Sequence, residues 1–316
     1  MGMNLSSTVL EISNVKKYFP VHGGLFLRQQ GNVHAVDDVS FAVKRGETLG
    51  LVGESGCGKT TLGRCIMGLY DLSEGTIKLH GKDTAGLKGA ELKNLRLKMQ
   101  MVFQDPFESL NSRHTVKEIL EEKYIIHNRL NSSKFSWLPS ASIVKKNGEE
   151  SLRGKSVEDE KSMDDELSAL LERVGLSKSA MSRFPHEFSG GQRQRIGIAR
   201  AISLNPEVII CDEPVSALDV SVQSQILNLL LELQRDMGLT TLFISHDLSV
   251  VRHVSDRIAV MYLGKIVEIG DAVSVYRNPS HPYTQAMISA VPMPDPEAKR
   301  KRIILEGEVP SPITPP

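Results

Sequence analysis

The residues with the clearest chemical potential form a glycine-rich run that ends in a lysine and a threonine, at positions 53–60 (Gly-Glu-Ser-Gly-Cys-Gly-Lys-Thr). The run fits the pattern G-x-x-x-x-G-K-[ST], in which glycines let the backbone curl so that successive N–H groups face phosphate oxygens. Lys59 would then reach the outer phosphates of a nucleotide, and the Thr60 hydroxyl would bind Mg²⁺. We assign nucleotide binding in and beside this run to Gly53, Ser55, Gly56, Cys57, Gly58, Lys59, Thr60 and Thr61.

The sequence around the run decides between this interpretation and an ordinary glycine turn with an exposed lysine. Residues 48–52 are an apolar stretch typical of a buried strand, and residues 60–69 place apolar side chains at helical spacing. A helix that begins at the loop would add the positive end of its dipole to the phosphate site. The order of strand, glycine loop and helix therefore favours phosphate binding.

A pair of acids supplies the partner that such a loop needs. Four apolar residues, 208–211, precede Asp212 and Glu213. Asp212 is placed to hold Mg²⁺ directly or through water, and Glu213 could polarise the attacking water as a general base. Two carboxylates at the end of a strand could also be a solvated turn, but the glycine loop earlier in the chain argues against that alternative.

Whole-chain composition excludes several other classes. The chain has 316 residues, enough for one large domain with appendages, and 38 Lys+Arg balance 38 Asp+Glu, which gives no support for a nucleic-acid binder. Its three scattered cysteines suit reduced thiols rather than a disulfide framework. We see no secretory signal and no apolar run long enough to span a bilayer.

The periodicity along the chain predicts its elements. Residues 9–18 and 36–43 read as strands joined by a loop at 20–32. The middle of the chain reads as mostly helical, with a helix at 164–174, and from residue 208 strands and helices alternate. The proline-rich tail from residue 278 predicts a segment that wraps or extends without a core of its own.

A second anion-binding helix start lies at residues 188–195 (Phe-Ser-Gly-Gly-Gln-Arg-Gln-Arg). This stretch resembles the signature of ABC ATPases, with Phe188 in place of the commoner leucine. The resemblance explains why one chain has two phosphate-binding helix starts: in these ATPases the signature of one subunit closes over the nucleotide of the other. It implies a head-to-tail dimer in which the partner's ATP contacts Ser189, Gly190, Gly191, Gln192 and Asp219.

The remaining elements of the ABC pattern occur in order. Tyr18 resembles the aromatic residue that stacks on adenine, with Val36 lining the same pocket, although Tyr18 could also be a core aromatic. Gln104 resembles the glutamine that senses the γ-phosphate through Mg²⁺ and water, and His246 resembles the switch histidine. The resemblance implies catalytic roles for Glu213, His246 and Gln104, and a Mg²⁺ site made by Thr60, Gln104 and Asp212.

The resemblance also implies the fold and the domain limits. We expect an α/β P-loop ABC ATPase with a RecA-like core, an antiparallel β subdomain, a helical subdomain and a C-terminal extension. The ATPase domain would span residues 8–277, with the helical subdomain at about 105–203 and a flexible insertion, or alternatively a docking segment, at 131–161. Residues 278–316 would form the proline-rich extension.

Finer resemblance is to the ATPases of oligopeptide and dipeptide importers, and within them to the second ATPase type. It rests on residues 16–20 and 23–26, on residues 104–111, and on residues 278–286 followed by 289–292. It implies ATP and Mg²⁺ as cofactors, and a peripheral place on the cytoplasmic face of the inner membrane. The implied partners are a second ATPase chain, two permeases and an extracytoplasmic binding protein, without nucleic acid.

Several alternatives stay open at this point. Similar ATPases import nickel chelates or glutathione, and an exporter motor or a soluble ABC protein acting in translation or DNA repair would carry the same ATPase motifs. Some relatives have a cysteine cluster in the tail. Because this sequence has no cysteine after Cys211, we expect no iron–sulfur cluster in this chain.

Overall fold

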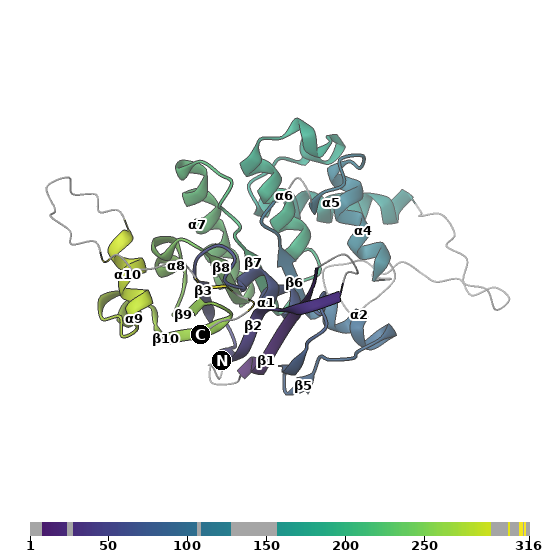
Figure 1. Cartoon of the computed structure of the whole chain (residues 1–316). Helices are drawn as coiled ribbons and strands as arrows, with labels where there is room; N and C mark the ends of the chain where they lie inside the picture. Colours follow the sequence, from purple (N-terminus) through teal and green to yellow (C-terminus); the bar gives the residue numbers. More distant parts are fainter. Residues whose placement is uncertain are drawn as a thin grey trace, which may run out of the picture. The chain divides into compact units, whose positions relative to one another are not determined.

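The computed structural model of the chain describes residues 8–23, 28–105, 109–127 and 157–291, together with residues 303, 310, 311 and 313. The described residues divide into two compact units. The first contains residues up to Gln104, Glu207–Ser216 and the residues from Leu230 onwards. The second contains Asp105–Pro206 and Ala217–Leu229, so helix α7 (Val220–Met237) begins in the second unit and ends in the first. Figure 1 shows the elements of both units.

The first unit is built on a six-stranded sheet. Its strands lie in the order β10 (Lys265–Asp271), β9 (Arg257–Tyr262), β3 (Thr48–Val52), β8 (Thr240–Ser245), β7 (Val208–Asp212) and β6 (Met99–Val102). All neighbouring pairs are parallel except β9 with β10. Strands β3, β6, β7 and β8 are buried along their whole length, which is why their sequences are nearly continuous apolar runs.

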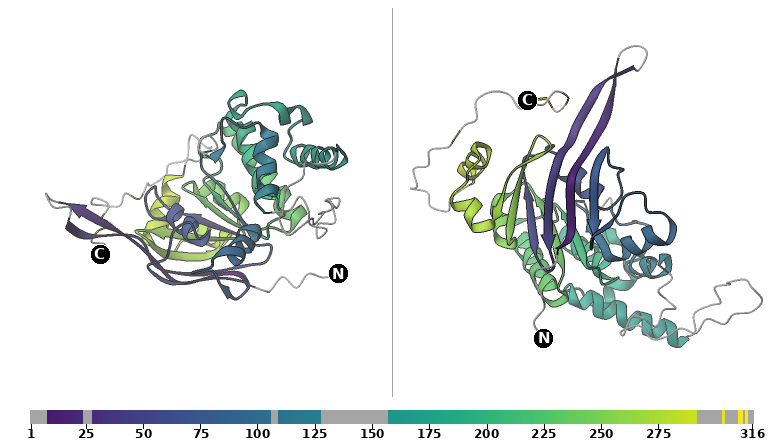
Figure 2. Two further views of the ribbon diagram at one scale, coloured as in Figure 1. Left: turned by 90° about the vertical axis from the view of Figure 1, so that its right-hand side faces the viewer. Right: turned by 90° about the horizontal axis from the view of Figure 1, so that it is seen from below.

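A second, antiparallel sheet of the same unit has the order β2 (Arg28–Lys44), β1 (Thr8–Gly23), β4 (Glu74–Leu79) and β5 (Lys82–Asp83). Strands β1 and β2 form a long hairpin, seen in purple in Figure 2. The loop predicted at residues 20–32 is therefore largely wrong, since Pro20 pairs with Asn32 and Val21 with Gly31. Proline is tolerated here because β1 pairs with β4 only as far as Lys16, which leaves this part of the strand with one partner.

Helix α1 (Lys59–Ile66) contacts strands of both sheets. Its Leu62, Cys65 and Ile66 are buried in the same hydrophobic core as side chains of β1 and β4 from one sheet and of β3, β7 and β8 from the other. A helix buried on this many sides has little freedom to shift, so its first residue is held firmly. The other helices of this unit are α2 (Gly89–Lys98), α8 (Leu248–Val254), α9 (Ala272–Arg277) and α10 (Pro282–Ala290).

The beginning of the tail differs from the prediction. Residues 282–290 form the helix α10, which was not predicted, and Tyr283, Thr284 and Ala286 are buried. Pro282 occupies the start of this helix, where its missing N–H costs nothing, and His281 caps it by accepting from the Tyr283 N–H through Nδ1 at 3.2 Å. The sequence interpretation took the prolines as a signal of a segment that wraps or extends, and it missed this favourable helix start.

The second unit is helical. It contains α4 (Val116–Ile126), α5 (Val157–Arg173), the short 3₁₀ turns η2 (Lys178–Ser182) and η3 (Pro185–Glu187), α6 (Gly190–Ile202) and the first part of α7. Helices α4 and α5 both pack against α6 and η2. The buried Tyr124 donates its hydroxyl to the Ser203 carbonyl at 3.0 Å, which joins the end of α4 to the end of α6.

Most of the predicted insertion at residues 131–161 lies outside the described residues. Its last part does not, because α5 begins at Val157 and not at residue 164 as predicted. Residues 157–163 (Val-Glu-Asp-Glu-Lys-Ser-Met) lack glycine and proline, so their sequence is compatible with a helix. Within the described part of the chain, no helix combines the length and apolar character needed to cross a membrane.

The start of α4 provides a test of the second unit's stability. The Thr115 hydroxyl accepts from the Glu118 N–H at 3.3 Å, and the Glu118 carboxylate accepts from the Thr115 N–H at 2.7 Å. Replacing Thr115 with Ala removes one half of this capping box, and we expect the free energy of unfolding to fall by about 1 kcal/mol. Urea denaturation followed by circular dichroism measures the change. Thr115→Ser, which keeps the hydroxyl, should stay close to the wild type; equal losses in both variants would contradict the capping role.

Candidate nucleotide-binding site

The residues of the first unit that are predicted to bind phosphate and Mg²⁺ or to catalyse hydrolysis lie at one edge of the six-stranded sheet, whereas Tyr18 and Val36 belong to the antiparallel sheet. The pairs Val52 with Ser245, Asp212 with Ile244 and Val102 with Cys211 show that β3, β8, β7 and β6 end at nearly the same level. The glycine loop follows β3, and His246 follows β8. The acidic pair stands at the end of β7, and Gln104 comes two residues after β6. Figure 1 shows β3, β7 and β8 side by side, with α1 beside them. Open parallel sheets bind their ligands at this edge.

The last glycine of the loop, Gly58, packs tightly against β2. Gly58 has φ 110° and stands before the first residue of α1, and a Cβ added there would lie 1.9 Å from the Ala35 carbonyl oxygen. No other residue could occupy this position without moving β2. The loop thus turns directly into the helix, and the unpaired N–H groups that begin a helix are suited to bind an anion at such a place.

Lys59 lies inside this loop. It is only 4% exposed, and its Nζ donates to the carbonyls of Gly53 at 2.7 Å and Glu54 at 2.8 Å. Two carbonyl dipoles therefore hold a buried ammonium at the place where the pattern predicts phosphate binding. Of the other predicted binding residues, Ser55 and Gly56 are exposed, Thr60 and Thr61 are half-buried, and Cys57 is buried.

Oxygen ligands suitable for Mg²⁺ meet next to the lysine. The Thr60 hydroxyl donates to the Asp212 carboxylate at 3.0 Å. Asp212 is 2% exposed, and burial raises the pKa of its carboxyl above the ordinary value, against the opposing effect of the Thr60 hydrogen bond. Among the described residues no three His, Cys, Asp or Glu side chains gather as a metal site. A magnesium ion held by Thr60, Asp212 and the predicted third ligand, Gln104, would complete its coordination with water and phosphate oxygens, as this ion commonly does.

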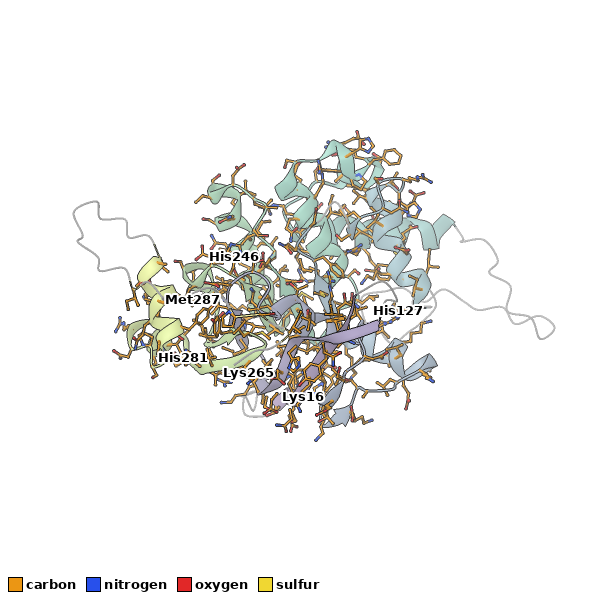
Figure 3. All side chains as sticks on the ribbon, in the orientation of Figure 1. Lys16, His127, His246, Lys265, His281 and Met287 are labelled. Atoms are coloured by element: carbon orange, nitrogen blue, oxygen red, sulfur yellow. The ribbon has the colours of Figure 1, made fainter. Side chains whose placement is uncertain are left out.

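Two of the three predicted catalytic residues, Gln104 and His246, contact the same carboxylate oxygen of the third, Glu213. Glu213 Oε2 accepts from Gln104 Nε2 at 3.0 Å and lies 3.3 Å from His246 Nδ1. The Glu213 side chain is 12% exposed and that of His246 is 54% exposed, so the carboxylate lies inside and the imidazole lies outside. Figure 3 labels His246 at this edge of the sheet. The amide and the imidazole thus orient a carboxylate that could accept a proton from water.

The backbone of Glu213 is also specially held. Its φ is 45°, in the left-handed region that non-glycine residues seldom adopt, and its N–H donates to the Ile244 carbonyl at 2.9 Å. Asp212 and Glu213 therefore leave β7 in different directions, which is why adjacent acids contact different partners: Asp212 contacts Thr60, whereas Glu213 contacts Gln104 and His246.

The residues predicted to contact adenine occupy unlike environments. The Tyr18 ring stacks on His34, with centroids 4.2 Å apart, and its hydroxyl donates to Asp37 at 2.5 Å. Burial and this hydrogen bond raise the pKa of Tyr18 to about 12. Tyr18 is half-buried, as a surface aromatic would be, whereas Val36 is 0% exposed and packs in the hydrophobic core. Sequence reasoning missed His34 and Asp37.

The signature residues belong to the second unit and form the start of α6. The Ser189 hydroxyl accepts from the Gln192 N–H at 3.3 Å, and Gln192 Oε1 accepts from the Ser189 N–H at 3.0 Å. A Cβ at Gly191 would lie 2.4 Å from a methyl of Val222, so this glycine allows α6 and α7 to approach. Ser189, Gln192 and Asp219 are exposed, as a surface that contacts a partner requires.

One contact of the glycine loop comes from far along the chain. The Tyr283 hydroxyl of α10 accepts from the Glu54 N–H at 2.9 Å. Residues 281–283 (His-Pro-Tyr) stood out in the sequence as a family mark, but no local pattern showed what the tyrosine would touch. Only the tertiary structure brings it to the loop.

The strand, glycine loop and helix, with an acidic strand end beside them, define the chain as a P-loop nucleotide-binding protein. Comparisons with known proteins refine this class. The model of the family described as "ABC transporter" matches residues 36–216, and that described as "Oligopeptide/dipeptide transporter, C-terminal region" matches residues 267–316.

Curated relatives match almost the whole chain. The oligopeptide transport ATP-binding protein AppF of Bacillus subtilis is 53% identical over 98% of this chain and 86% of its own length. The oligopeptide transport ATP-binding protein OppF of Salmonella typhimurium is 48% identical over 98% of this chain and 85% of its own. Among solved structures, the ATP-binding cassette MJ0796, dimeric with ADP and Pi, has a TM-score of 0.65 at 26% identity, covering 83% of this chain and 98% of that one. This chain belongs to the ABC transporter family and is one of its ATP-binding ATPases.

The buried carboxylate of Asp212 is expected to lower the stability of the protein although ATP hydrolysis requires it. Because burial raises the pKa of Asp212, its ionised form destabilises the fold at neutral pH, and this cost disappears as the pH falls and the carboxyl is protonated. Asp212→Asn should therefore raise the apparent Tm of the nucleotide-free protein at pH 7, by an amount that shrinks toward pH 4, while abolishing Mg²⁺-dependent ATP hydrolysis. Thermal scans against pH measure the first effect.

The exposed Asp236 on α7 provides the matched control. Asp236→Asn removes the same charge from the protein surface, in the last turn of α7 where the helix dipole disfavours an acid, and should raise the Tm by much less than Asp212→Asn does. A lower Tm for Asp212→Asn than for the wild type at pH 7 would contradict this electrostatic account of the site.

Proposed function

We propose that this chain is the ATP-hydrolysing subunit that powers an ABC importer for oligopeptides or dipeptides. The observation that supports ATP hydrolysis is that Gln104 and His246 both contact one oxygen of Glu213, beside the hydrogen bond of Thr60 to Asp212. The relatives named as oligopeptide transport ATP-binding proteins, and the family match at residues 267–316, support a role in peptide transport.

These contacts support a separate role for each residue of the site. Lys59 and the N–H groups of the loop bind the phosphates, while Thr60, Gln104 and Asp212 would hold Mg²⁺, which when bound would neutralise charge on the phosphate oxygens. Glu213 polarises the attacking water and accepts its proton. Gln104 and His246 keep that carboxylate oriented, and Tyr18 contributes the aromatic surface for adenine, with Val36 supporting the strand behind it.

We place the second half of each nucleotide site on a partner. ABC ATPase cassettes dimerise, and the MJ0796 cassette is dimeric in its solved structures. In our proposal Ser189, Gly190, Gly191, Gln192 and Asp219 of one subunit contact the nucleotide held by the loop of the other. We further propose that the partner is a second ATPase type, and that the pair works with two permeases and an extracytoplasmic binding protein at the cytoplasmic face of the inner membrane.

The same proposal includes the domain limits. The ATPase domain spans residues 8–277, with its helical subdomain at about 105–203, and residues 278–316 form the peptide-importer extension. The two family matches and the separation of a helical unit support this division.

One relative keeps a second cargo open. The glutathione import ATP-binding protein GsiA of Pectobacterium atrosepticum is 47% identical over 96% of this chain and 45% of its own length. Glutathione is itself a tripeptide, so the two cargo classes overlap chemically. Oligopeptides remain the preferred cargo because the first relatives named above cover most of their own length as well.

The role of Glu213 is tested by replacing it with Gln. We expect ATP turnover to fall by about 10²- to 10⁴-fold, because the amide cannot accept the proton, while affinity for Mg-ATP stays within a few-fold of the wild type. Steady-state phosphate release and equilibrium nucleotide binding measure the two quantities. Glu232→Gln, on the exposed side of α7, is the control. Near-normal hydrolysis in Glu213→Gln would remove Glu213 from its role.

The transport function is tested in the native cells. Purification of the chain in mild detergent, followed by mass spectrometry, should recover two permeases and a second ATPase. Cells in which Lys59→Ala replaces the wild type should lose uptake of labelled tri- to pentapeptides. Loss of glutathione or nickel-chelate uptake with unchanged peptide uptake would reassign the cargo. Recovery of ribosomes or DNA-repair proteins in place of permeases would overturn the importer.

A further inference from the structure

The peptide group that joins Gly53 to Glu54 is held from both sides. Its carbonyl oxygen, on Gly53, accepts from Lys59 Nζ at 2.7 Å, and its N–H, on Glu54, donates to the Tyr283 hydroxyl at 2.9 Å. The C=O and N–H of a trans peptide group point in opposite directions. The hydroxyl therefore determines which way this carbonyl points, and the carbonyl in turn is one of the two that hold the ammonium.

Tyr283 is placed with little freedom. It is 3% exposed, and its ring lies against Tyr262 with centroids 4.3 Å apart and planes inclined by 34°. Tyr262 ends β9, which pairs with the strand leading into the glycine loop through Val52 and Val260. The hydroxyl is thus supported by the same sheet that supports the loop.

The helix that carries Tyr283 is itself anchored to that sheet. The Glu268 carboxylate of β10 accepts from the N–H groups of Ser280 at 2.8 Å and His281 at 3.0 Å. Burial alone would raise the pKa of Glu268, but these donors bring it below the ordinary value, so the carboxylate is charged at neutral pH. Figure 3 labels His281 and Met287 in this part of the chain. The start of α10 therefore has a fixed position relative to β10.

The hydroxyl keeps its proton throughout the working pH range. Burial raises the pKa of Tyr283 well above that of an exposed tyrosine. A neutral hydroxyl accepts the Glu54 hydrogen bond without placing a negative charge beside the loop that is proposed to bind the phosphates. The chemistry of the contact thus suits a site that must bind an anion.

We propose that Tyr283 is a positioning residue for the nucleotide: its hydroxyl fixes the Gly53–Glu54 peptide so that the Gly53 carbonyl holds the Lys59 ammonium in the phosphate site. The inference rests on the proposed binding of ATP by this loop. It gives the region matched by the C-terminal family model a part in phosphate binding within its own subunit. Without the hydroxyl, the peptide can rotate, and the ammonium loses one of its two carbonyl partners.

The experiment compares the affinity of the full-length chain for Mg-AMP-PNP, measured by calorimetry, in matched variants. Tyr283→Phe removes one oxygen and keeps the ring, and we expect affinity to fall by about 3- to 10-fold. Tyr262→Phe removes the same atom from the stacked neighbour, for which no hydrogen bond of the hydroxyl is found among the described residues, and should stay within 2-fold of the wild type. Urea denaturation of both variants checks that packing is preserved.

A double-mutant cycle with Lys59→Ala separates positioning from packing. Because the tyrosine acts through the lysine, the penalty of Tyr283→Phe should largely vanish when Lys59 is absent, with weak affinities compared by displacement of a fluorescent ATP analogue. An undiminished penalty in the Lys59→Ala background, equal losses in Tyr283→Phe and Tyr262→Phe, or no loss in Tyr283→Phe would each overturn the inference. If the wild type itself fails to bind Mg-AMP-PNP, the proposed function falls as well, so the two failures are distinguishable.

Discussion

The parallel pairing of β3 with β8, and of β8 with β7, is the constraint on which the site depends. Adjacent parallel strands end at the same edge, so residues that follow Val52, Ser245 and Asp212 must lie near one another although they are far apart in the chain. The pairing needs buried apolar strands, and the core around α1 supplies the packing that keeps them level. The glycine loop, the acids and the histidine meet because of this pairing, and a slip of register would separate them.

The buried charged groups at this edge of the sheet destabilise the fold. An ammonium that is 4% exposed and a carboxylate that is 2% exposed lie in the same small region, and burial raises the pKa of the carboxyl. Carbonyl groups of the loop and the Thr60 hydroxyl satisfy these groups locally. Such arrangements bind a charged ligand better than they stabilise the protein, because the groups are held in place before the ligand arrives. Stability comes from the two apolar faces around α1 rather than from the site.

Sequence reasoning succeeded where a local pattern determines the local structure. The strand at 48–52, the glycine loop and the acids after residue 211 needed only their neighbours to be recognised, and the structure brings Gln104, Glu213 and His246 together. It failed where long-range contacts decide. Pro20 and Gly31 read as loop residues, yet pairing between β1 and β2 keeps both in strands. Tyr283 contacts a residue 229 positions away, which no spacing rule in the sequence can reveal.

The burial of every cysteine in this chain has a practical consequence. All three cysteines, Cys57, Cys65 and Cys211, are buried, and burial raises the pKa of each thiol, to about 11 for Cys65 and about 12 for Cys211. Thiol reagents attack the thiolate, so the native cysteines react slowly. A single cysteine introduced on an exposed position would therefore take up a fluorescent or spin label selectively, without prior removal of Cys57 from the phosphate loop. The wild-type chain is in this respect already a suitable background for spectroscopic measurement of the distance between the two subunits of the proposed dimer.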